Sequence, residues 1–208
     1  MVHPSSSTSD RRERERGQRR ALILRAAERV FAAAGFHGAS VESIAAEAEL
    51  ATGTIYLYFI NKEALYASVF EEKIAEKVAY IESEARATDD PLDGLRRAVR
   101  AQLDFYDQHR AFFEIFLRQN PVTPPPGQAA AALAPKLYQR HVELLRELIE
   151  AAQRQDQIRP LQSEKLAPLL IGMAVQITRD GLGQDPREPL ADQAELVLEL
   201  FLHGVAAK

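Results

Sequence analysis

Residues 52–65 read TGTIYLYFINKEAL, and this stretch has the composition of a helix that faces something other than bulk water. Ile55 and Phe59 are four residues apart and would form an apolar pair on one helical face. The side chains opposite this pair are short hydroxyls and tyrosines rather than long charged groups: Thr52, Thr54, Tyr56 and Tyr58. Hydroxyls donate hydrogen bonds to phosphate oxygens, and methyl and ring groups lie against base edges. The stretch therefore predicts about three turns of a recognition helix for a DNA groove.

The residues before this stretch predict the rest of a helix-turn-helix. Residues 40–48 favour a short helix, with Ser40 as its N-cap and Glu42 placed favourably in its first turn. Residues 49–51 then form a link short enough for a helix-turn-helix. Upstream, apolar residues recur at helical spacing from Ile23 onward, and we expect that first helix to end at Gly35. Three helices in this order predict a small DNA-binding domain.

Residues 20–69 resemble the DNA-binding domain of the TetR family of transcriptional regulators. The matching residues, in order along the chain, are Ile23-Leu24-Arg25-Ala26-Ala27, Phe31, Gly35-Phe36, Ile44-Ala45, the run from Gly53 to Phe59, and Lys62-Glu63-Ala64-Leu65. The resemblance covers about the first third of the chain and implies that Lys62 meets a phosphate. The residues then expected to bind DNA are Ser40, Thr52, Gly53, Thr54, Tyr56, Leu57, Tyr58 and Lys62.

The chain departs from the family pattern in the turn. The family usually places Gly where this chain has Glu49, and often a Ser cap where it has Ala51. Glutamate lacks the freedom of glycine at positive φ, and it adds a negative charge near the expected DNA. We expect Thr52 to take over part of the capping. The departures bear on the geometry of the turn and on the operator sequence more than on the fold.

The sequence predicts three parts: a flexible arginine-rich arm over residues 1–17, the DNA-binding domain over 18–66, and a helical domain over 67–208. The net charge is −4, and residues 1–70 carry +1 while the remainder carries −5. The densest group of positive charges lies within residues 11–20 and consists of Arg11, Arg12, Arg14, Arg16, Arg19 and Arg20. Two interpretations of the arm remain open: a solvated segment of mixed charge, or an arm that touches phosphates or a narrow minor groove.

Beyond residue 70 the patterns are helical throughout, so the fold class is all-α. Predicted helices cover 62–87, 92–108, 111–118, 128–155, 163–181 and 190–206, with an Asp89 or Asp90 cap before Pro91. Residues 120–127 are a proline-rich loop, and Pro135 either kinks its helix or marks the helix start. The family pairs its last two helices with their copies in a four-helix bundle. The residues expected at this homodimer interface are Leu166, Leu170, Met173, Ile177, Leu196, Leu200 and Phe201.

Aromatic residues cluster in the middle of the second domain. Members of the family usually hold a small-molecule cavity between these helices, so the resemblance implies a pocket for an apolar or aromatic effector. The candidate lining residues are Phe105, Tyr106, His109, Phe112, Phe113, Phe116, Tyr138, His141, Met173 and Gln176. The alternative is that the aromatics are ordinary core residues, since aromatics at helical spacing commonly pack inside a protein.

Composition limits the other classes of function. The chain has no cysteine, and its five histidines lack metal-ligand spacing, so we expect no metal and no cofactor. We find none of the common catalytic motifs and expect no enzyme activity. No apolar run approaches the length of about 20 that crosses a bilayer, so we expect a cytoplasmic protein without membrane contact. The sequence thus predicts a repressor that an effector releases from a palindromic double-stranded operator. The alternatives are an activator and a helical protein-binding adaptor.

Overall fold

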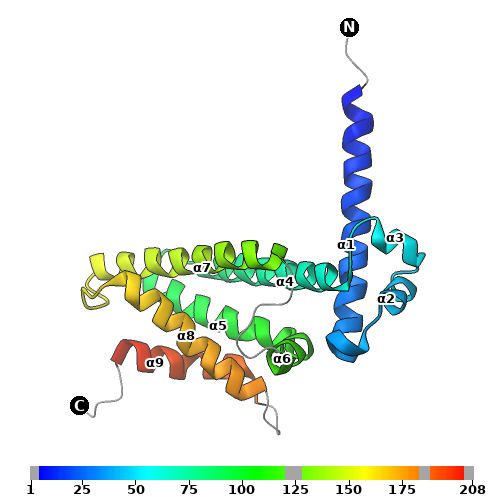
Figure 1. Ribbon diagram of the computed structural model, residues 1–208. Helices are drawn as coiled ribbons and strands as arrows, with labels where there is room; N and C mark the ends of the chain where they lie inside the picture. The colour runs from blue at the N-terminus through cyan, green and yellow to red at the C-terminus, as the bar shows by residue number, and fades with distance from the viewer. Residues whose placement is uncertain (1–4, 120–127, 183–187, 204–208) are drawn as a thin grey trace. The chain divides into compact units, whose positions relative to one another are not determined.

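The computed structural model describes residues 5–119, 128–182 and 188–203, with side-chain surroundings for residues 10–114, 135–182 and 188–203. Every regular element within these ranges is helical, which confirms the all-α prediction (Figure 1). The described chain forms two compact units, one up to Glu71 and one from Glu72 onward, with residues 128–131 grouped with the first. We call them the N-terminal unit and the C-terminal unit. Their boundary falls inside α4 (Lys62–Ala85), a few residues after the division between residues 66 and 67 that the sequence suggests.

The N-terminal unit contains α1 (Ser5–Gly38), α2 (Val41–Glu47), α3 (Thr52–Tyr56) and the first turns of α4. α2 packs against both α1 and α3. The core of the N-terminal unit is made of side chains that are almost completely buried and that recur at helical spacing, including Ile23, Leu24, Phe31, Ile44, Ile55 and Leu65. Three of its rings also pack together, since Tyr66 meets Phe31 at 4.8 Å and Phe36 at 5.1 Å between ring centroids. The predicted three-helix arrangement is present.

The course of α1 differs from expectation at its start, and its assigned span continues a few residues past the predicted end. The helix begins at Ser5, so residues 5–17 are part of it rather than an arm that precedes it. Near the other end, Gly35 has φ 69° and ψ 176°, which interrupts the helical backbone. Only glycine adopts this region readily, because any Cβ would clash with the neighbouring carbonyl groups. Gly35 therefore ends the regular helix as predicted, although short-range helical bonding continues to Gly38.

The helix predicted over residues 52–65 is wrong in its length. α3 ends at Tyr56, and α4 begins separately at Lys62. The side chain of Asn61 explains the new start, because its Oδ1 accepts from the amide of Ala64 over 2.7 Å in the manner of an N-cap. Asn61 therefore competes with a continuous helix. The result is a short helix of about one turn, α3, followed by a non-helical bridge over residues 57–61.

The C-terminal unit is built around α5 (Pro91–Gln108), which contacts α6 (Arg110–Gln119), α8 (Ser163–Leu182), the 3-10 turn η1 (Leu190–Gln193) and α9 (Ala194–His203). α7 (Gln128–Arg154) contributes its residues from Ala132 onward to the same unit, and Pro135 lies inside this helix. The predicted cap of α5 is confirmed, since the Asp90 carboxylate accepts from the Leu92 amide over 3.2 Å and Pro91 occupies the first turn. The loop predicted over residues 120–127 lies outside the described residues.

Two negative findings apply to the described part of the chain. No helix in it combines the length and the apolar character that a membrane crossing requires. Within the same residues, no group of three or more His, Asp or Glu side chains is arranged to hold a metal ion.

Candidate nucleic-acid interface and ligand-binding region

α2 starts from a complete capping box. The Ser40 hydroxyl accepts from the Ser43 amide over 3.0 Å, and the Ser43 hydroxyl accepts from the Ser40 amide over 3.1 Å. Both groups satisfy amides that the first helical turn would otherwise leave unpaired. The predicted capping role of Ser40 is therefore confirmed. Its side chain is also exposed, so a contact with DNA at this position stays a prediction.

The turn between α2 and α3 is held by the backbone. The Leu50 amide donates to the Ala45 carbonyl over 2.9 Å, and the Glu49 amide donates to the Ala46 carbonyl over 3.1 Å. This pair of bonds is the Schellman motif, which requires a left-handed residue after the helix. That residue is Glu49, with φ 55°. A left-handed conformation costs a non-glycine residue about 1–2 kcal/mol, so the turn holds this geometry at the expense of backbone strain.

α3 lacks the side-chain cap that we expected. Its N-cap is Ala51, and no side chain caps the first turn. The expected compensation by Thr52 is therefore wrong, because Thr52 is already the first helical residue and its side chain does not bond back to the turn. A five-residue helix without a cap has little stability of its own. It depends on the burial of Ile55, which is 1% exposed.

The outward side of α3 and the bridge after it carry the residues predicted to bind DNA. Ile55 and Phe59 point into the core as predicted, while Tyr56 is 51% exposed and Leu57 is 75% exposed. Thr52, Thr54 and Tyr58 are half-buried. Gly53 is exposed, and a Cβ built on it would meet nothing within 4 Å, so the packing of the protein does not require glycine there. An uncapped, uncharged helix face with hydroxyls and a bare glycine suits close approach to a phosphate backbone.

Lys62 is held differently from the sequence-based expectation. Its Nζ donates to the carbonyl oxygen of Phe36 over 2.8 Å and to that of Ala39 over 3.0 Å. The ammonium also lies 4.4 Å from the centroid of the Phe36 ring. These contacts use two of the three ammonium donors to tie the start of α4 to the chain that leaves α1. In the free protein Lys62 is therefore an internal brace, and its contact with a phosphate stays a prediction.

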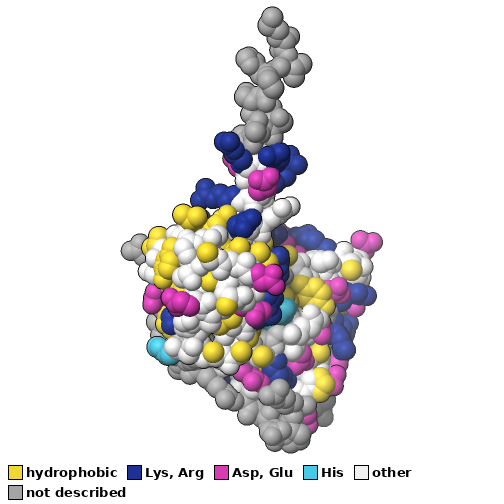
Figure 2. Space-filling view, turned by 90° about the vertical axis from the view of Figure 1, so that its right-hand side faces the viewer, with side chains coloured by type: hydrophobic (Ala, Val, Ile, Leu, Met, Phe, Trp, Pro, Cys, Tyr) yellow, Lys and Arg dark blue, Asp and Glu magenta, His cyan; other side chains and the backbone are white. Residues whose placement is uncertain are grey.

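Basic side chains gather on the N-terminal part of α1, which extends past α2 and α3 within the N-terminal unit (Figure 1). Figure 2 shows dark blue basic side chains interspersed with magenta acidic ones along this stretch, and every residue from Asp10 to Arg20 is exposed. Arg11 pairs with Glu15 at 3.3 Å, which leaves most of the neighbouring arginines without a described ion pair within the unit. The segment therefore presents a series of exposed arginines, and their contact with DNA stays a prediction.

The C-terminal unit brings together part of the predicted effector set. Tyr106 meets Phe113 edge-on at 4.6 Å, Phe105 lies 4.4 Å from His109, and Phe112 lies 5.3 Å from Phe113. His141 is 3% exposed, and burial together with the charge of Lys77 lowers the pKa of its imidazole to about 3. Tyr138 and Gln176 are exposed instead, Met173 is half-buried, and the Phe116 side chain lies outside the described residues.

The residues predicted at the homodimer interface differ in how exposed they are. Leu170 on α8 is completely buried, so it belongs to the core of the C-terminal unit. Its neighbour Leu169 is 60% exposed and Leu196 on α9 is 47% exposed. The remaining predicted residues are half-buried on the same two helices: Leu166, Met173, Ile177, Leu200 and Phe201. α8 and α9 contact each other, so their exposed leucines offer a candidate surface for a second copy.

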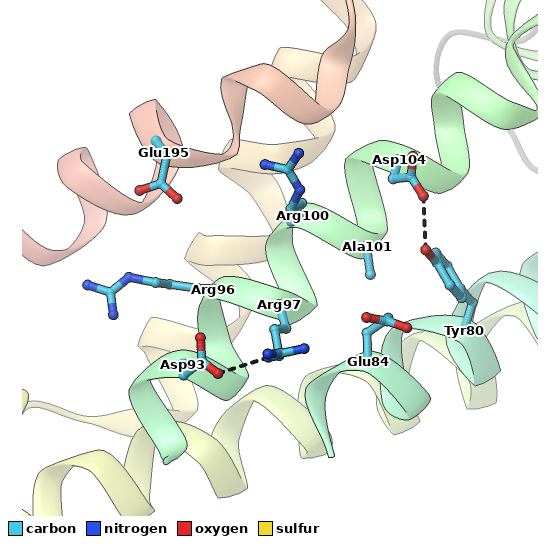
Figure 3. A pocket seen from close by; sticks show the side chains of 9 residues that line it. All are labelled: Tyr80, Glu84, Asp93, Arg96, Arg97, Arg100, Ala101, Asp104 and Glu195. Carbon is cyan, nitrogen blue, oxygen red and sulfur yellow. Dashed lines mark hydrogen bonds and ion pairs between the residues drawn. The ribbon is translucent and has the colours of Figure 1, made fainter. Parts of the chain in front are cut away.

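An open hollow of about 440 Å³ lies between α4, α5 and α9 (Figure 3). None of the residues predicted to bind the effector lines it. Its lining includes three arginines, Arg96, Arg97 and Arg100, and four carboxylates, Glu84, Asp93, Asp104 and Glu195. Arg97 donates to Asp93 over 2.8 Å, and the Tyr80 hydroxyl donates to Asp104 over 2.9 Å. Its charges largely cancel, and its polar lining does not suit the apolar effector predicted from the sequence.

Comparison with known proteins places these features in a family. The family model described as "Bacterial regulatory proteins, tetR family" matches residues 23–69, which span the helices of the candidate DNA interface. The HTH-type transcriptional activator FasR of Mycolicibacterium smegmatis is 30% identical over 119 residues, which are 57% of this chain and 54% of FasR. The chain thus spans about half the length of that relative. The uncharacterized HTH-type transcriptional regulator YdgC of Bacillus subtilis is 27% identical over 91% of this chain and 93% of its own length.

Solved structures share the whole fold. The transcriptional regulator FadR from Bacillus subtilis, solved in complex with stearoyl-CoA, superposes with a TM-score of 0.74 at 23% identity. The match covers 89% of this chain and 99% of that structure. At this level of identity the similarity shows a common fold for both units of the chain.

Proposed function

Because this chain is a member of the TetR family of bacterial regulatory proteins, with the helix-turn-helix of a DNA-binding transcriptional regulator, we propose that it is a ligand-responsive repressor. In this proposal a homodimer binds a palindromic operator through two copies of α3, and a small effector with an apolar body releases it. A DNA-binding regulator works where the chromosome is, so we place the protein in the cytoplasm.

The observation that carries the DNA-binding half of this proposal is the outward face of α3. Tyr56 is 51% exposed and lies on α3 with the exposed Gly53, so this face of the helix is open to a partner. Ile55 on the opposite face is 1% exposed and holds α3 against the core. We propose that the Tyr56 hydroxyl donates to a phosphate oxygen. We further propose that Thr52 and Leu57 face base edges, where a hydroxyl and a methyl-bearing group distinguish base pairs.

Tyr56→Phe tests this interface, and Tyr138→Phe is its matched control because Tyr138 is also about half exposed, at 49%, but lies on α7. A hydrogen bond to a charged group contributes about 1.5–3 kcal/mol, so Tyr56→Phe should weaken operator binding about tenfold or more on every operator sequence. Tyr138→Phe should bind as the parent protein does. Equal affinity for the parent and Tyr56→Phe contradicts the phosphate contact.

A homodimer follows from the size of the DNA-reading element. A five-residue helix reaches few base pairs, and two copies related by a two-fold axis read a palindrome with half-sites about 34–36 Å apart. We propose that the exposed leucines of α8 and α9, Leu169 and Leu196, lie at the centre of the dimer interface. Leu169→Glu together with Leu196→Glu should yield monomers in analytical ultracentrifugation. Persistence of the dimer contradicts this surface.

The effector proposal rests on the aromatic cluster of the C-terminal unit. FadR of Bacillus subtilis was solved with stearoyl-CoA, and a long acyl chain is the kind of apolar body that would pack against Phe105, Phe112 and Phe113. Binding releases DNA only to the extent that the ligand prefers a conformation in which the two α3 helices no longer fit successive grooves. α4 holds the boundary between the units, so we propose it as the element that transmits the change.

The sign of regulation is proposed as repression because a dimer bound across a promoter excludes other proteins from it. FasR is named an activator, so the sign requires its own test. Deletion of the gene should raise expression of a reporter that is fused to the operator-bearing promoter. A fall in expression on deletion supports activation instead.

A further inference from the structure

Three polar side chains on three helices are buried together in the C-terminal unit. Lys77 on α4 is 8% exposed, Gln102 on α5 is 2% exposed, and His141 on α7 is 3% exposed. Core positions usually hold apolar side chains, and lysine is rarely buried unless it is paired. The cluster therefore needs an explanation that packing alone does not supply.

The partner of Lys77 is neutral. Its Nζ donates to the Tyr106 hydroxyl over 3.1 Å and lies 5.1 Å from the centroid of the Tyr106 ring. Lys73, one helical turn earlier, is also buried but pairs with the Glu76 carboxylate over 2.7 Å. Among the residues with described side chains, no carboxylate forms an ion pair with Lys77. A buried ammonium without a counter-charge is unfavourable, since protein groups replace its water shell only in part.

The two other members of the cluster have unused hydrogen-bonding atoms. Nε2 of Gln102 and Nε2 of His141 are both buried, and no described residue bonds to either. Gln102 is one turn before Tyr106 on α5, so it lies on the helical face to which Lys77 bonds. His141 is close enough to Lys77 for the ammonium charge to lower the pKa of the imidazole. The imidazole is thus neutral, and it offers an N–H donor when the proton is on Nε2.

The cluster therefore presents one positive charge and additional N–H donors without an anionic acceptor. A carboxylate matches it, because it carries one negative charge and its two oxygens accept several hydrogen bonds. An alcohol or an ester lacks the charge, and a phosphate dianion would leave one negative charge unbalanced. The adjoining rings of Phe105 and Phe113 are buried and apolar, which suits the remainder of such a ligand.

We propose that Lys77, Gln102 and His141 bind the carboxylate of a monocarboxylic acid whose body is apolar. This inference rests on the proposed function, because it names the chemical class of the effector. It adds two residues that the sequence pattern did not mark, Lys77 and Gln102, to the candidates Tyr106 and His141. It also refines the expected apolar effector into an apolar acid.

Direct binding by calorimetry tests the inference without any use of DNA. The probes are saturated acids from octanoate to palmitate together with phenylacetate and benzoate, each beside its methyl ester, and palmitoyl-CoA as the thioester. At least one acid should bind at least tenfold more tightly than its methyl ester. Equal binding of acid and ester, binding of the thioester alone, or binding of no probe overturns the inference. Operator binding by the ligand-free protein is measured separately, so failure of the acid does not count as failure of the regulator.

Lys77→Met assigns the preference to the ammonium. The variant should bind acid and ester with the same affinity, and its ligand-free form should melt at a higher temperature, because an apolar side chain of similar length replaces an unpaired buried charge. A purely structural lysine would instead give a lower melting temperature and an unchanged preference, which overturns the proposal. Lys136→Met, which removes an exposed lysine on α7, is the matched control.

Gln102→Leu and a spectroscopic measurement cover the case in which Lys77→Met fails to fold. Gln102→Leu removes one proposed donor and should reduce acid binding while it leaves ester binding unchanged. In ¹⁵N-histidine spectra of the parent protein, the acid but not its ester should move the His141 resonance. If the chemical shift of His141 does not change when the acid is added, the cluster is not the carboxylate site. Unchanged acid binding by Gln102→Leu leads to the same conclusion.

Discussion

The ammonium of Lys62 and the carbonyl oxygen of Phe36 are joined by a 2.8 Å hydrogen bond, which ties the first residue of α4 to the end of α1. The same ammonium donates to the Ala39 carbonyl and lies over the Phe36 ring. Since Lys62 and Phe36 flank the helix-turn-helix on its two sides, this brace fixes the position from which α2 and α3 are presented. It gives the lysine a structural role that its place in the motif does not reveal.

Lys62→Met should destabilise the N-terminal unit. The change leaves two carbonyls without their charged donor, and hydrogen bonds of this kind contribute about 1.5–3 kcal/mol. Urea denaturation should show a loss of that size, with Lys136→Met as an exposed control. If the third ammonium donor meets a phosphate, as the family resemblance implies, the slope of the salt dependence of operator binding should become shallower by about 0.9 in the variant. An unchanged slope would show that Lys62 acts only as the internal brace.

Glu49→Gly should stabilise the N-terminal unit by about 1 kcal/mol, because glycine adopts the left-handed conformation at φ 55° without strain. Glu49→Ala is the matched variant, since it removes the same charge but keeps a Cβ at the strained position. It should give no comparable gain in the free energy of unfolding. If both variants stabilise the protein equally, charge rather than backbone strain is the cause.

Gly53→Ala should separate stability from DNA binding. Because a Cβ at Gly53 meets nothing within 4 Å and alanine favours helix more than glycine, the free energy of unfolding should stay the same or rise by up to about 1 kcal/mol. Operator affinity should fall, since the added methyl lies on the face of α3 that we propose approaches the DNA backbone. Thermal melts and anisotropy titrations measure the two effects. Unchanged affinity would show that this face of α3 does not reach the DNA.

His141 should make the protein less stable in mild acid. In the unfolded chain the His141 imidazole takes up a proton near pH 6.5. In the folded protein, burial and the charge of Lys77 lower its pKa to about 3, so the free energy of unfolding falls as the pH drops below 6.5. Between pH 7 and pH 5 the contribution is about 2 kcal/mol, at about 1.4 kcal/mol per pH unit. Urea denaturation of His141→Phe should show a correspondingly smaller loss over this window. His203→Gln, at an exposed site, should behave as the parent does.

The fold was largely predictable because its signals are local. Helical periodicity, the Asp90 cap and the break at Gly35 each act within a few residues, and the structure contains all three. The prediction of one helix over residues 52–65 failed because two local signals compete there. The apolar pair Ile55 and Phe59 favours a continuous helix, but the Asn61 cap starts a second one. Glu49 departs from the family pattern, and the positive φ of its backbone shows the strain that this departure costs.

The proposed ligand-binding cluster was harder to predict, because its side chains come from three separate helices. Aromatic residues near Phe105 stood out because they are neighbours in sequence. Lys77 and Gln102 did not, since each resembles an ordinary surface residue until its burial is known. A partial signal was present for Lys77, which directly precedes the fully buried positions Val78 and Ile81 on α4. Only the packed structure shows that its charge lies inside.

A fluorescence-anisotropy titration of the full chain against DNA from upstream of its own gene, with scrambled DNA as control and at two salt concentrations, tests the central claim most directly. We predict tight, sequence-selective and salt-dependent binding with one dimer per palindromic site, weakened at every operator by Tyr56→Phe. Binding no tighter than that to scrambled DNA, together with no selected sequence from a random DNA pool, would contradict the account of the chain as an operator-binding regulator.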